Sequence, residues 1–342
     1  MSNRVILVTG GAGYIGSHTC KALAHAGFVP VVLDNLTTGH KTAVRWGPLI
    51  EGDIRDRDLV ERTIREERIE AVVHLAGHAY VGESMRDPGK YFANNVGGSL
   101  SLLEAAQACG VDHIVFSSTC STYGIPQSAR ISEDDRQHPV NPYGESKLFV
   151  ERALHWYGVV HGMRTVALRY FNAAGADPDG EVGEDHGPET HLIPQAIGAV
   201  LGTHAPLGIN GTDYPTLDGT AVRDYVHVND LADAHVRALA YLQGGGASIA
   251  CNLGAGEGRS VRDVIAAVER HTGRSVPWRA APRRPGDPAS LIAAPGRARE
   301  LLSWTPRRSD LATIISTAWE WHTARLSAHE LRTARNSRDA RV

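Results

Sequence analysis

The chain has 342 residues, of which 42% are apolar and 21% are charged, and its formal net charge is -3. This length allows a large buried core, and the balanced charge excludes the basic field typical of nucleic-acid-binding proteins. The four cysteines are scattered without a C-x-x-C spacing, so we expect free thiols. We therefore expect a small-molecule partner, no nucleic acid and no metal site.

The N-terminal residues run directly into an apolar segment and lack the pattern of a signal peptide. No stretch approaches the ~20 apolar residues that a membrane-spanning helix needs. The expectation is a cytoplasmic protein that has no membrane partner.

Short β-rich segments alternate with helical segments through the first half of the chain. The expected strands are residues 5–9, 29–33, 71–75, 113–116 and 165–169. Strands that alternate with helices imply right-handed βαβ units and a parallel sheet. The strands are apolar at successive positions, as strands covered on both faces should be. The predicted fold is therefore α/β, with a doubly wound parallel sheet.

A glycine-rich turn connects the first expected strand to the first helix. Gly10, Gly13 and Gly16 form a G-x-x-G-x-x-G motif in this position. Glycines there permit a tight turn and allow backbone N–H groups to approach a pyrophosphate at the helix N-terminus. The motif predicts a Rossmann-type dinucleotide site, and a plain strand-to-helix turn is the alternative.

Asp34 ends the second expected strand, where an acidic side chain accepts hydrogen bonds from the adenosine ribose. A carboxylate there repels a 2′-phosphate and no arginine follows it in residues 34–39, so NAD is favoured over NADP. The alternative is that Asp34 only caps the following turn. Residues 53–54 and 75–77 close later strands and are weaker candidates for cofactor contacts.

Tyr143 and Lys147 lie four positions apart and therefore share one face of a helix. A free tyrosine phenol has a pKa of about 10 and is a poor base at neutral pH. The Lys147 ammonium and a positive nicotinamide ring would lower the pKa of Tyr143. Thr119 follows the strand 113–116 and offers a hydroxyl to the reacting oxygen. These three residues predict proton transfer beside a dinucleotide.

The composition changes after Asn172, where residues 173–188 and 207–220 are rich in Gly, Asp and Pro. Such segments form ligand-shaping loops more readily than core. We expect residues 1–172 to form the NAD-binding domain and residues 173–330 a smaller substrate lobe that is partly interleaved with it. Residues 331–342 are expected to form a tail.

Several longer motifs resemble the extended short-chain dehydrogenases/reductases, and most closely the UDP-glucose 4-epimerase family. The resemblance covers nearly the whole chain, and its most specific parts are residues 81–84, 169–175, 219–228 and 283–287. It implies that Tyr143 takes the proton of the sugar 4-hydroxyl while C4 gives a hydride to tightly held NAD. The 4-keto sugar then turns over and receives the hydride on its other face.

The resemblance also implies which residues contact each ligand. Together with the residues argued above, the expected cofactor contacts are Gly10, Gly13, Tyr14, Ile15, Gly16, Asp34, Asn35, Asp53, Ile54, Leu75, Ala76, Gly77, Ala79, Asn94, Tyr143, Lys147 and Phe171. The expected nucleotide-sugar contacts are Thr119, Tyr143, Asn172, His191, Leu192, Gly208, Asn210, Arg223, Arg284, Asp287 and Leu291. The two arginines suit a diphosphate, whereas an ion pair with Asp224 or Asp218 is the alternative for Arg223.

Three positions depart from the family pattern. Ala79 stands where many members carry lysine, and Asn210 replaces the usual aromatic residue beside the uracil. Leu291 is intermediate between the large and small residues that restrict or admit N-acetyl sugars. Residues 79–84 and 118–124 resemble a subgroup that includes UDP-xylose/UDP-arabinose 4-epimerases. UDP-xylose/UDP-arabinose, UDP-glucuronate and UDP-N-acetylhexosamines therefore remain alternatives to UDP-glucose/UDP-galactose.

Other activities are compatible with the same fold. A 4,6-dehydratase or a decarboxylating relative should carry a carboxylate directly after Thr119, where Cys120 and Ser121 stand instead. A dehydrogenase with exchangeable NAD is a further alternative, and a non-catalytic NAD or nucleotide-sugar sensor is a remote one. By analogy with the family, helices within residues 96–109 and 144–160 would form a homodimer contact.

Overall fold

The structure is a computed structural model that describes residues 4–284 and 286–339. Its centre is a seven-stranded parallel sheet with the strand order β10-β6-β5-β4-β1-β2-β3. The strands are β1 (Val5–Thr9), β2 (Val29–Asp34), β3 (Leu49–Glu51), β4 (Ala71–His74), β5 (His113–Thr119), β6 (Arg164–Tyr170) and β10 (Ile249–Leu253). This order confirms the predicted doubly wound α/β fold, and the order changes direction between β1 and β4.

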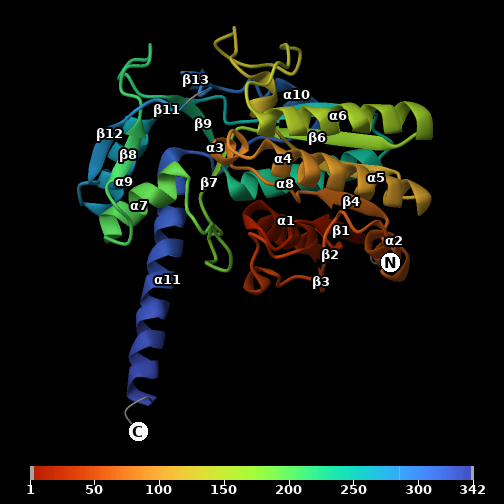
Figure 1. Cartoon of the computed structure of the whole chain (residues 1–342), viewed down its shortest axis with the longest axis horizontal. Coiled ribbons are helices and arrows are strands. Elements are labelled where there is room, and N and C mark those ends of the chain that lie inside the picture. The colour runs from red at the N-terminus through yellow and green to blue at the C-terminus, as the bar shows by residue number, and fades with distance from the viewer. Residues whose placement is uncertain (1–3, 285, 340–342) are drawn as a thin grey trace.

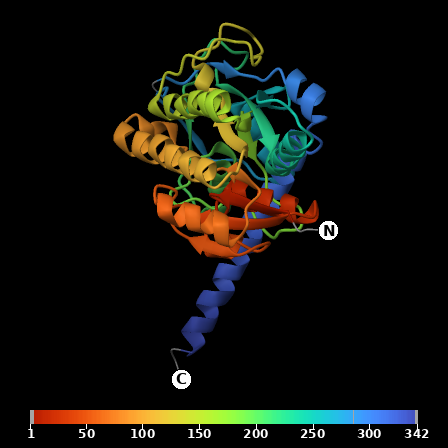
Figure 2. The ribbon, with the colours of Figure 1, turned by 90° about the vertical axis from the view of Figure 1, so that its right-hand side faces the viewer.

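Helices cover both faces of this sheet (Figures 1 and 2). In β1, Ile6 and Val8 pack into the cluster on one face, whereas Leu7 packs into the cluster on the other. All three are fully buried, which explains the absence of polar alternation in the strand. One face carries α1 (Tyr14–His25), α8 (Val228–Gln243) and α10 (Gly296–Leu302), and the other carries α2 (Arg57–Glu66), α5 (Gly98–Ala108) and α6 (Pro142–His161).

A smaller lobe lies beside the carboxyl ends of β5 and β6. It contains a four-stranded sheet of β7 (Asn172–Ala174), β9 (Val222–His227), β11 (Gly258–Ser260) and β13 (Ser290–Leu291). A two-stranded sheet pairs β8 (Leu207–Asn210) with β12 (Trp278–Ala281). Helices α7 (Leu192–Leu201), α9 (Val261–Thr272) and the first turns of α11 (Leu311–Asp339) supply the third core cluster.

The two parts of the chain share elements. After β9, helix α8 packs against α1 and strand β10 joins β6 in the large sheet. The division at residue 172 remains a prediction. Helix α11 continues to Asp339 and extends away from the body (Figures 1 and 2), so it includes most of the expected tail, and residues 340–342 lie outside the described residues. No described helix is long and apolar enough to cross a membrane.

Short helices connect the strand ends to the long helices of the sheet. They are η1 (Lys41–Ala43), α3 (Val81–Ser84), α4 (Pro88–Tyr91), η2 (Phe92–Gly97) and η3 (Cys120–Tyr123). Helix α6 starts where Asn141 caps it, since the Asn141 side chain accepts a hydrogen bond from Gly144 N at 2.8 Å. Pro142 at the first helical position and left-handed Gly162 at the end fix its limits.

Candidate active site

The glycine turn lies against the segment that follows β4. Gly10 has a φ of +73°, and a Cβ atom there would lie 2.6 Å from Ala76 N. A Cβ atom on Gly16 would lie 2.1 Å from Gly10 O, whereas one on Gly13 would meet only Gly10 O at 3.3 Å. The turn is therefore closed against the protein and open above Gly13, which is the shape that a pyrophosphate at the N-terminus of α1 requires.

Asp34 lies at the end of β2 beside this turn. Its buried carboxylate accepts hydrogen bonds from Ala12 N at 3.0 Å and Leu36 N at 2.8 Å. Burial raises the pKa of Asp34, while the two backbone donors oppose the rise. Asp34 thus caps the turn, as the alternative interpretation predicted, and its contact with the ribose remains a prediction.

Asp53 is hydrogen-bonded to Asn35, the residue that follows Asp34. The Asn35 side chain donates to Asp53 Oδ2 at 3.0 Å. Hydrogen bonds from Arg55 hold the pKa of Asp53 well below its usual range. Asp53 is therefore ionised and already paired, and Ile54 beside it is buried. The carboxyl ends of β1, β2 and β4 consequently line one edge of the sheet with the expected cofactor residues.

Tyr143, Lys147 and Thr119 meet at the end of β5. The Tyr143 hydroxyl shares a hydrogen bond with the Thr119 side chain. Lys147 Nζ donates to Ser117 O at 2.8 Å and lies 4.9 Å from the centre of the Phe116 ring. A Cβ atom on Gly77 would lie 3.3 Å from Lys147 Nζ, so the ammonium reaches the segment that follows β4. The structure therefore brings the three predicted residues together.

Burial shifts the pKa values of both ionisable side chains in this group. Burial raises the pKa of Tyr143 to about 12, although the hydrogen bond with Thr119 opposes the rise. Burial also lowers the pKa of Lys147 to about 8, and the charge of Glu151 partly opposes this effect. Burial thus has the largest effect on the pKa of Tyr143 in the protein alone. The expected lowering by Lys147 together with a positive nicotinamide ring remains a prediction.

Two polar networks hold α6, the helix that carries Tyr143 and Lys147, and neither was predicted from the sequence. Buried Asn95 donates from Nδ2 to Ser146 Oγ and to His78 O, both at 3.0 Å. Asn94, the expected cofactor contact, donates to Asn95 Oδ1 at 3.1 Å, and its contact with the cofactor remains a prediction. The sequence shows two adjacent asparagines at positions 94 and 95. Only the burial of Asn95 in the fold shows that this one holds α6 in position.

The second network contains Glu151, one turn after Lys147 on α6. Its carboxylate accepts from Arg169 Nη2 at 2.6 Å, and Ser118 Oγ donates to the same carboxylate. Both charged side chains are more than nine-tenths buried. The Glu151–Arg169 pair therefore links α6 to β5 and β6. In the sequence, only the four-residue spacing of Lys147 and Glu151 indicated that Glu151 lies on the same face of α6 as Lys147.

Several expected nucleotide-sugar residues meet in the smaller lobe. Arg223 Nη2 pairs with Asp287, whereas the alternative pairing with Asp224 or Asp218 is not found among the described residues. Asn210 lies beside Arg284, whose Nε is 3.2 Å from the Asn210 amide oxygen in the orientation that lets this oxygen accept. Arg223 and Arg284 therefore both lie in the smaller lobe, and their contact with a diphosphate remains a prediction.

Leu291 and Phe171 pack into a small buried cluster with Cys120 and Tyr123. Leu291 pairs in register with Arg223 across β13 and β9, so the two residues are neighbours in the smaller lobe. Asn172 begins β7, and Gly208 lies in β8 opposite Arg279. Whether these residues contact a sugar remains a prediction.

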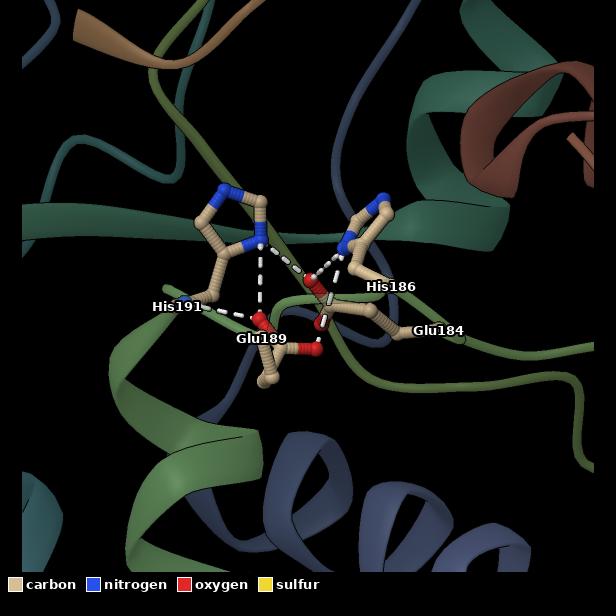
Figure 3. Close-up of side chains that lie close together, drawn as sticks. All are labelled: Glu184, His186, Glu189 and His191. Carbon is tan, nitrogen blue, oxygen red and sulfur yellow. Dashed lines mark hydrogen bonds and ion pairs between the residues drawn. The ribbon is translucent and has the colours of Figure 1, made fainter. Parts of the chain in front are cut away.

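His191 and Leu192 lie at the start of α7. The side chain of His191 points toward Glu184, within a group that also contains His186 and Glu189 (Figure 3). Its contact with a nucleotide sugar remains a prediction. Tyr14, an expected cofactor contact, donates its hydroxyl to Gly175 O at 2.6 Å. The 173–191 segment is thereby tied to the first helix.

Ala79 is exposed after β4 and offers no charge to a cofactor. Ile15 and Leu75 are half-buried against the sheet core. These positions can contribute apolar or backbone contacts only.

The fold and the site define an enzyme class that acts on a hydroxyl group with the help of a bound dinucleotide. Residues 6–254 match the NAD dependent epimerase/dehydratase family, and the chain belongs to this family. This result confirms the identification made from the sequence, the assignment of NAD as cofactor and the expectation of an isomerase.

The chain is similar over nearly its full length to proteins named UDP-glucose 4-epimerase. The one from Rhizobium leguminosarum bv. trifolii is 52% identical over 322 residues, which are 94% of this chain and 98% of the relative. The Brucella ovis UDP-glucose 4-epimerase in complex with NAD is 52% identical with a TM-score of 0.91, and the match covers 93% of this chain and 98% of that one. A Stenotrophomonas maltophila UDP-glucose-4-epimerase with bound NAD and formylated UDP-arabinopyranose is 39% identical, with a TM-score of 0.92 and coverages of 95% and 100%.

Proposed function

We propose that the protein interconverts UDP-glucose and UDP-galactose by NAD-dependent inversion at C4, with Tyr143 as the base. The observation that carries this proposal is the hydrogen-bonded pair of Tyr143 and Thr119, with Lys147 beside it, at the end of β5. The names of the relatives that are about half identical to this chain support the same reaction.

The residues of the chain have separate tasks in this reaction. When bound between these residues, NAD would supply a reversible hydride acceptor for C4 of the sugar. Gly10, Gly13 and Gly16 accommodate the pyrophosphate and Asp34 accepts from the ribose hydroxyls. Tyr143 removes the proton of the 4-hydroxyl while Thr119 orients that oxygen.

Tyr143 needs help to act as a base at neutral pH, since burial raises its pKa to about 12. Thr119 stabilises the phenolate by hydrogen bonding, and Lys147 holds a positive charge within the same buried site. A positive ring placed beside Tyr143 would add to both effects because opposite charges favour the ionised phenol. The proposal therefore requires ionisation of Tyr143 to be coupled to occupation of the cofactor site.

The residues after Thr119 argue against elimination of water. Burial raises the pKa of Cys120 to about 12, so its thiol stays neutral and is a poor base at physiological pH. The Ser121 side chain is a hydroxyl and supplies no carboxylic acid. A dehydratase would need a proton donor and acceptor at this point, so inversion at C4 is the reaction that the site supports.

We propose a cytoplasmic homodimer. The four cysteines are free, which suits a reducing compartment. Phe149, Trp156 and Val160 lie on one face of α6 and are 47%, 61% and 66% exposed. Burial of this apolar stripe against the same stripe of a second copy would form a two-fold symmetric interface.

The test is incubation of the purified protein with UDP-glucose without added NAD, followed by separation of the products. Formation of UDP-galactose supports the proposal and shows that NAD is retained during purification. UDP-xylose, UDP-glucuronate and UDP-N-acetylglucosamine assayed in parallel identify the preferred sugar. Absence of any C4 epimer would contradict the proposal.

A further inference from the structure

We propose that Glu184, His186, Glu189 and His191 bind one Zn²⁺ ion. Their Nδ1 and carboxylate oxygen atoms all lie within 4.8 Å of one another, and the four residues come from a single turn of chain just before α7 (Figure 3). This site goes beyond the epimerase reaction and does not depend on it. It also departs from the sequence-based expectation of no metal site.

The spacing of the donor atoms suits a tetrahedral metal. His186 Nδ1 lies 3.2 Å from a Glu184 oxygen and 3.7 Å from a Glu189 oxygen, and His191 Nδ1 lies 4.0 Å from the other Glu189 oxygen. Ligands about 2.0–2.2 Å from a zinc ion are separated by about 3.3–3.6 Å in a tetrahedron. The contact between His191 Nδ1 and Glu184 must lengthen to admit the ion.

The ligand types select the metal. Two imidazole nitrogens with two carboxylates suit Zn²⁺ or a related transition metal, whereas Ca²⁺ and Mg²⁺ prefer oxygen ligands alone. In Figure 3 both Nδ1 atoms point toward the two carboxylates. The histidines thus present their nitrogens to one point without a change of side-chain direction.

The surrounding contacts hold the ligands in place. Glu189 Oε1 accepts from Thr190 N at 2.7 Å and from His191 N at 2.8 Å. Trp321 of α11 donates to Glu184 O at 2.9 Å. Glu184 and Glu189 side chains are only 4% and 7% exposed. The two carboxylates are therefore fixed in position beside the two histidine rings, as ligands of a structural metal should be.

A second acidic group shows the contrast. Asp177, Asp179 and Glu181 also lie close together, but Lys21 Nζ occupies their centre at 2.6–2.8 Å from each carboxylate. That group is neutralised by a fixed ammonium. Among the described residues, the ion-pair partners of Glu184 and Glu189 are His186 and His191, which are themselves metal-ligating side chains.

Zinc at this site would fasten the segment before α7 to the nucleotide-binding half of the protein. The His186 ring makes edge contacts with Tyr14 of α1 and with Tyr80 after β4, with ring centres 6.2 and 5.9 Å apart. His191 immediately precedes Leu192, the first residue of α7. With four protein ligands, the ion would be structural. Nδ1 of His191 would then bind the metal, so only the other atoms of this residue could make the nucleotide-sugar contact expected from the sequence.

The experiment is metal analysis of the full-length protein after treatment with EDTA, followed by addition of one equivalent of ZnCl₂ and gel filtration. We expect one zinc per chain and an X-ray absorption spectrum with two imidazole nitrogens, oxygen ligands and no sulfur. The thermal midpoint should rise on addition of zinc. His186→Gln should lose at least tenfold in zinc affinity, whereas His25→Gln, which removes an exposed histidine at the end of α1, should bind as the wild type does.

Two results would overturn the proposal. One is a wild-type protein that retains no zinc after gel filtration, in which case the cluster is an ion-paired group of protonated histidines and carboxylates. The other is zinc retained with a different ligand set, shown by sulfur in the absorption spectrum or by equal binding to His186→Gln. The wild-type measurements decide the question even if the variant does not fold.

Discussion

Substitution of Gly16 by alanine tests the geometry of the dinucleotide turn. The added Cβ would lie 2.1 Å from Gly10 O and 2.8 Å from Gly11 Cα, which are backbone atoms rather than flexible side chains. Gly10 cannot withdraw easily, because its N–H donates to Leu33 O at 2.9 Å and its carbonyl accepts from Gly13 N at 3.2 Å. The turn must therefore open by roughly 1 Å to bring the new contact into the range found in real proteins.

The magnitude follows from two opposing effects. Overpacking of a closed site costs about 1–3 kcal/mol or more, and the gain from replacing a helical glycine by alanine is at most about 1 kcal/mol. We expect the folded state to lose about 1–2 kcal/mol and NAD binding to fall further, because the turn that opens is the one that holds the pyrophosphate.

The assay compares NAD content after gel filtration and the free energy of unfolding in urea. Gly296→Ala is the matched control, since Gly296 also lies in a helix and a Cβ atom there would meet nothing within 4 Å. The control should be as stable as the wild type or slightly more stable. Full NAD content and unchanged stability of Gly16→Ala would refute the argument that this turn is closed against backbone atoms.

Three further predictions concern buried charge and assembly. Glu151→Gln leaves the buried guanidinium of Arg169 without its counter-charge, so the free energy of unfolding in urea should fall by about 3–5 kcal/mol. The control Glu104→Gln removes an exposed partner of Arg57 and should lower it by less than about 1 kcal/mol. Equal losses for the two variants would contradict the assigned burial of the Glu151–Arg169 pair. Because the pKa of Lys147 is lowered to about 8 from 10.5, the unfolded chain binds more protons between these values, and this residue's contribution to stability should rise with pH from about 8 to 10.5. Between pH 7.5 and 9.5, the free energy of unfolding of the wild type should therefore rise relative to that of Lys147→Met. A difference between the two proteins that does not change with pH would argue against the lowered pKa of Lys147. Trp156→Glu places a charge in the exposed stripe of α6, so light scattering should show a dimeric wild type and a monomeric variant; two identical masses would remove α6 from the proposed interface.

The central sheet was predictable because its strands carry an apolar run at every position. The expected strand at residues 5–9 agrees with β1, and the others differ from β2, β4, β5 and β6 by one to three residues at their ends. The glycine turn and the Tyr143/Lys147 helix were predictable for a similar reason, because their function depends on spacing within one element.

Contacts between distant elements were not predictable in the same way. Arg223 could pair with several nearby acids in the sequence, and only the fold brings Asp287 to it. The pKa of Tyr143 depends on complete burial, which the spacing to Lys147 does not reveal. The Glu-x-His-x-x-Glu-x-His pattern of residues 184–191 is visible in the sequence, but only the fold shows that its four side chains converge.

The central claim is that C4 of the sugar is oxidised and reduced again within one closed site. The most direct test is a single incubation of UDP-[4-²H]glucose with the purified protein in ordinary water, without added NAD, followed by mass and NMR analysis of the UDP-galactose formed. We expect that deuterium stays at C4 of the product and that Tyr143→Phe, with its NAD content unchanged, loses most of the turnover. Loss of the deuterium to water, or full turnover by Tyr143→Phe, would contradict it.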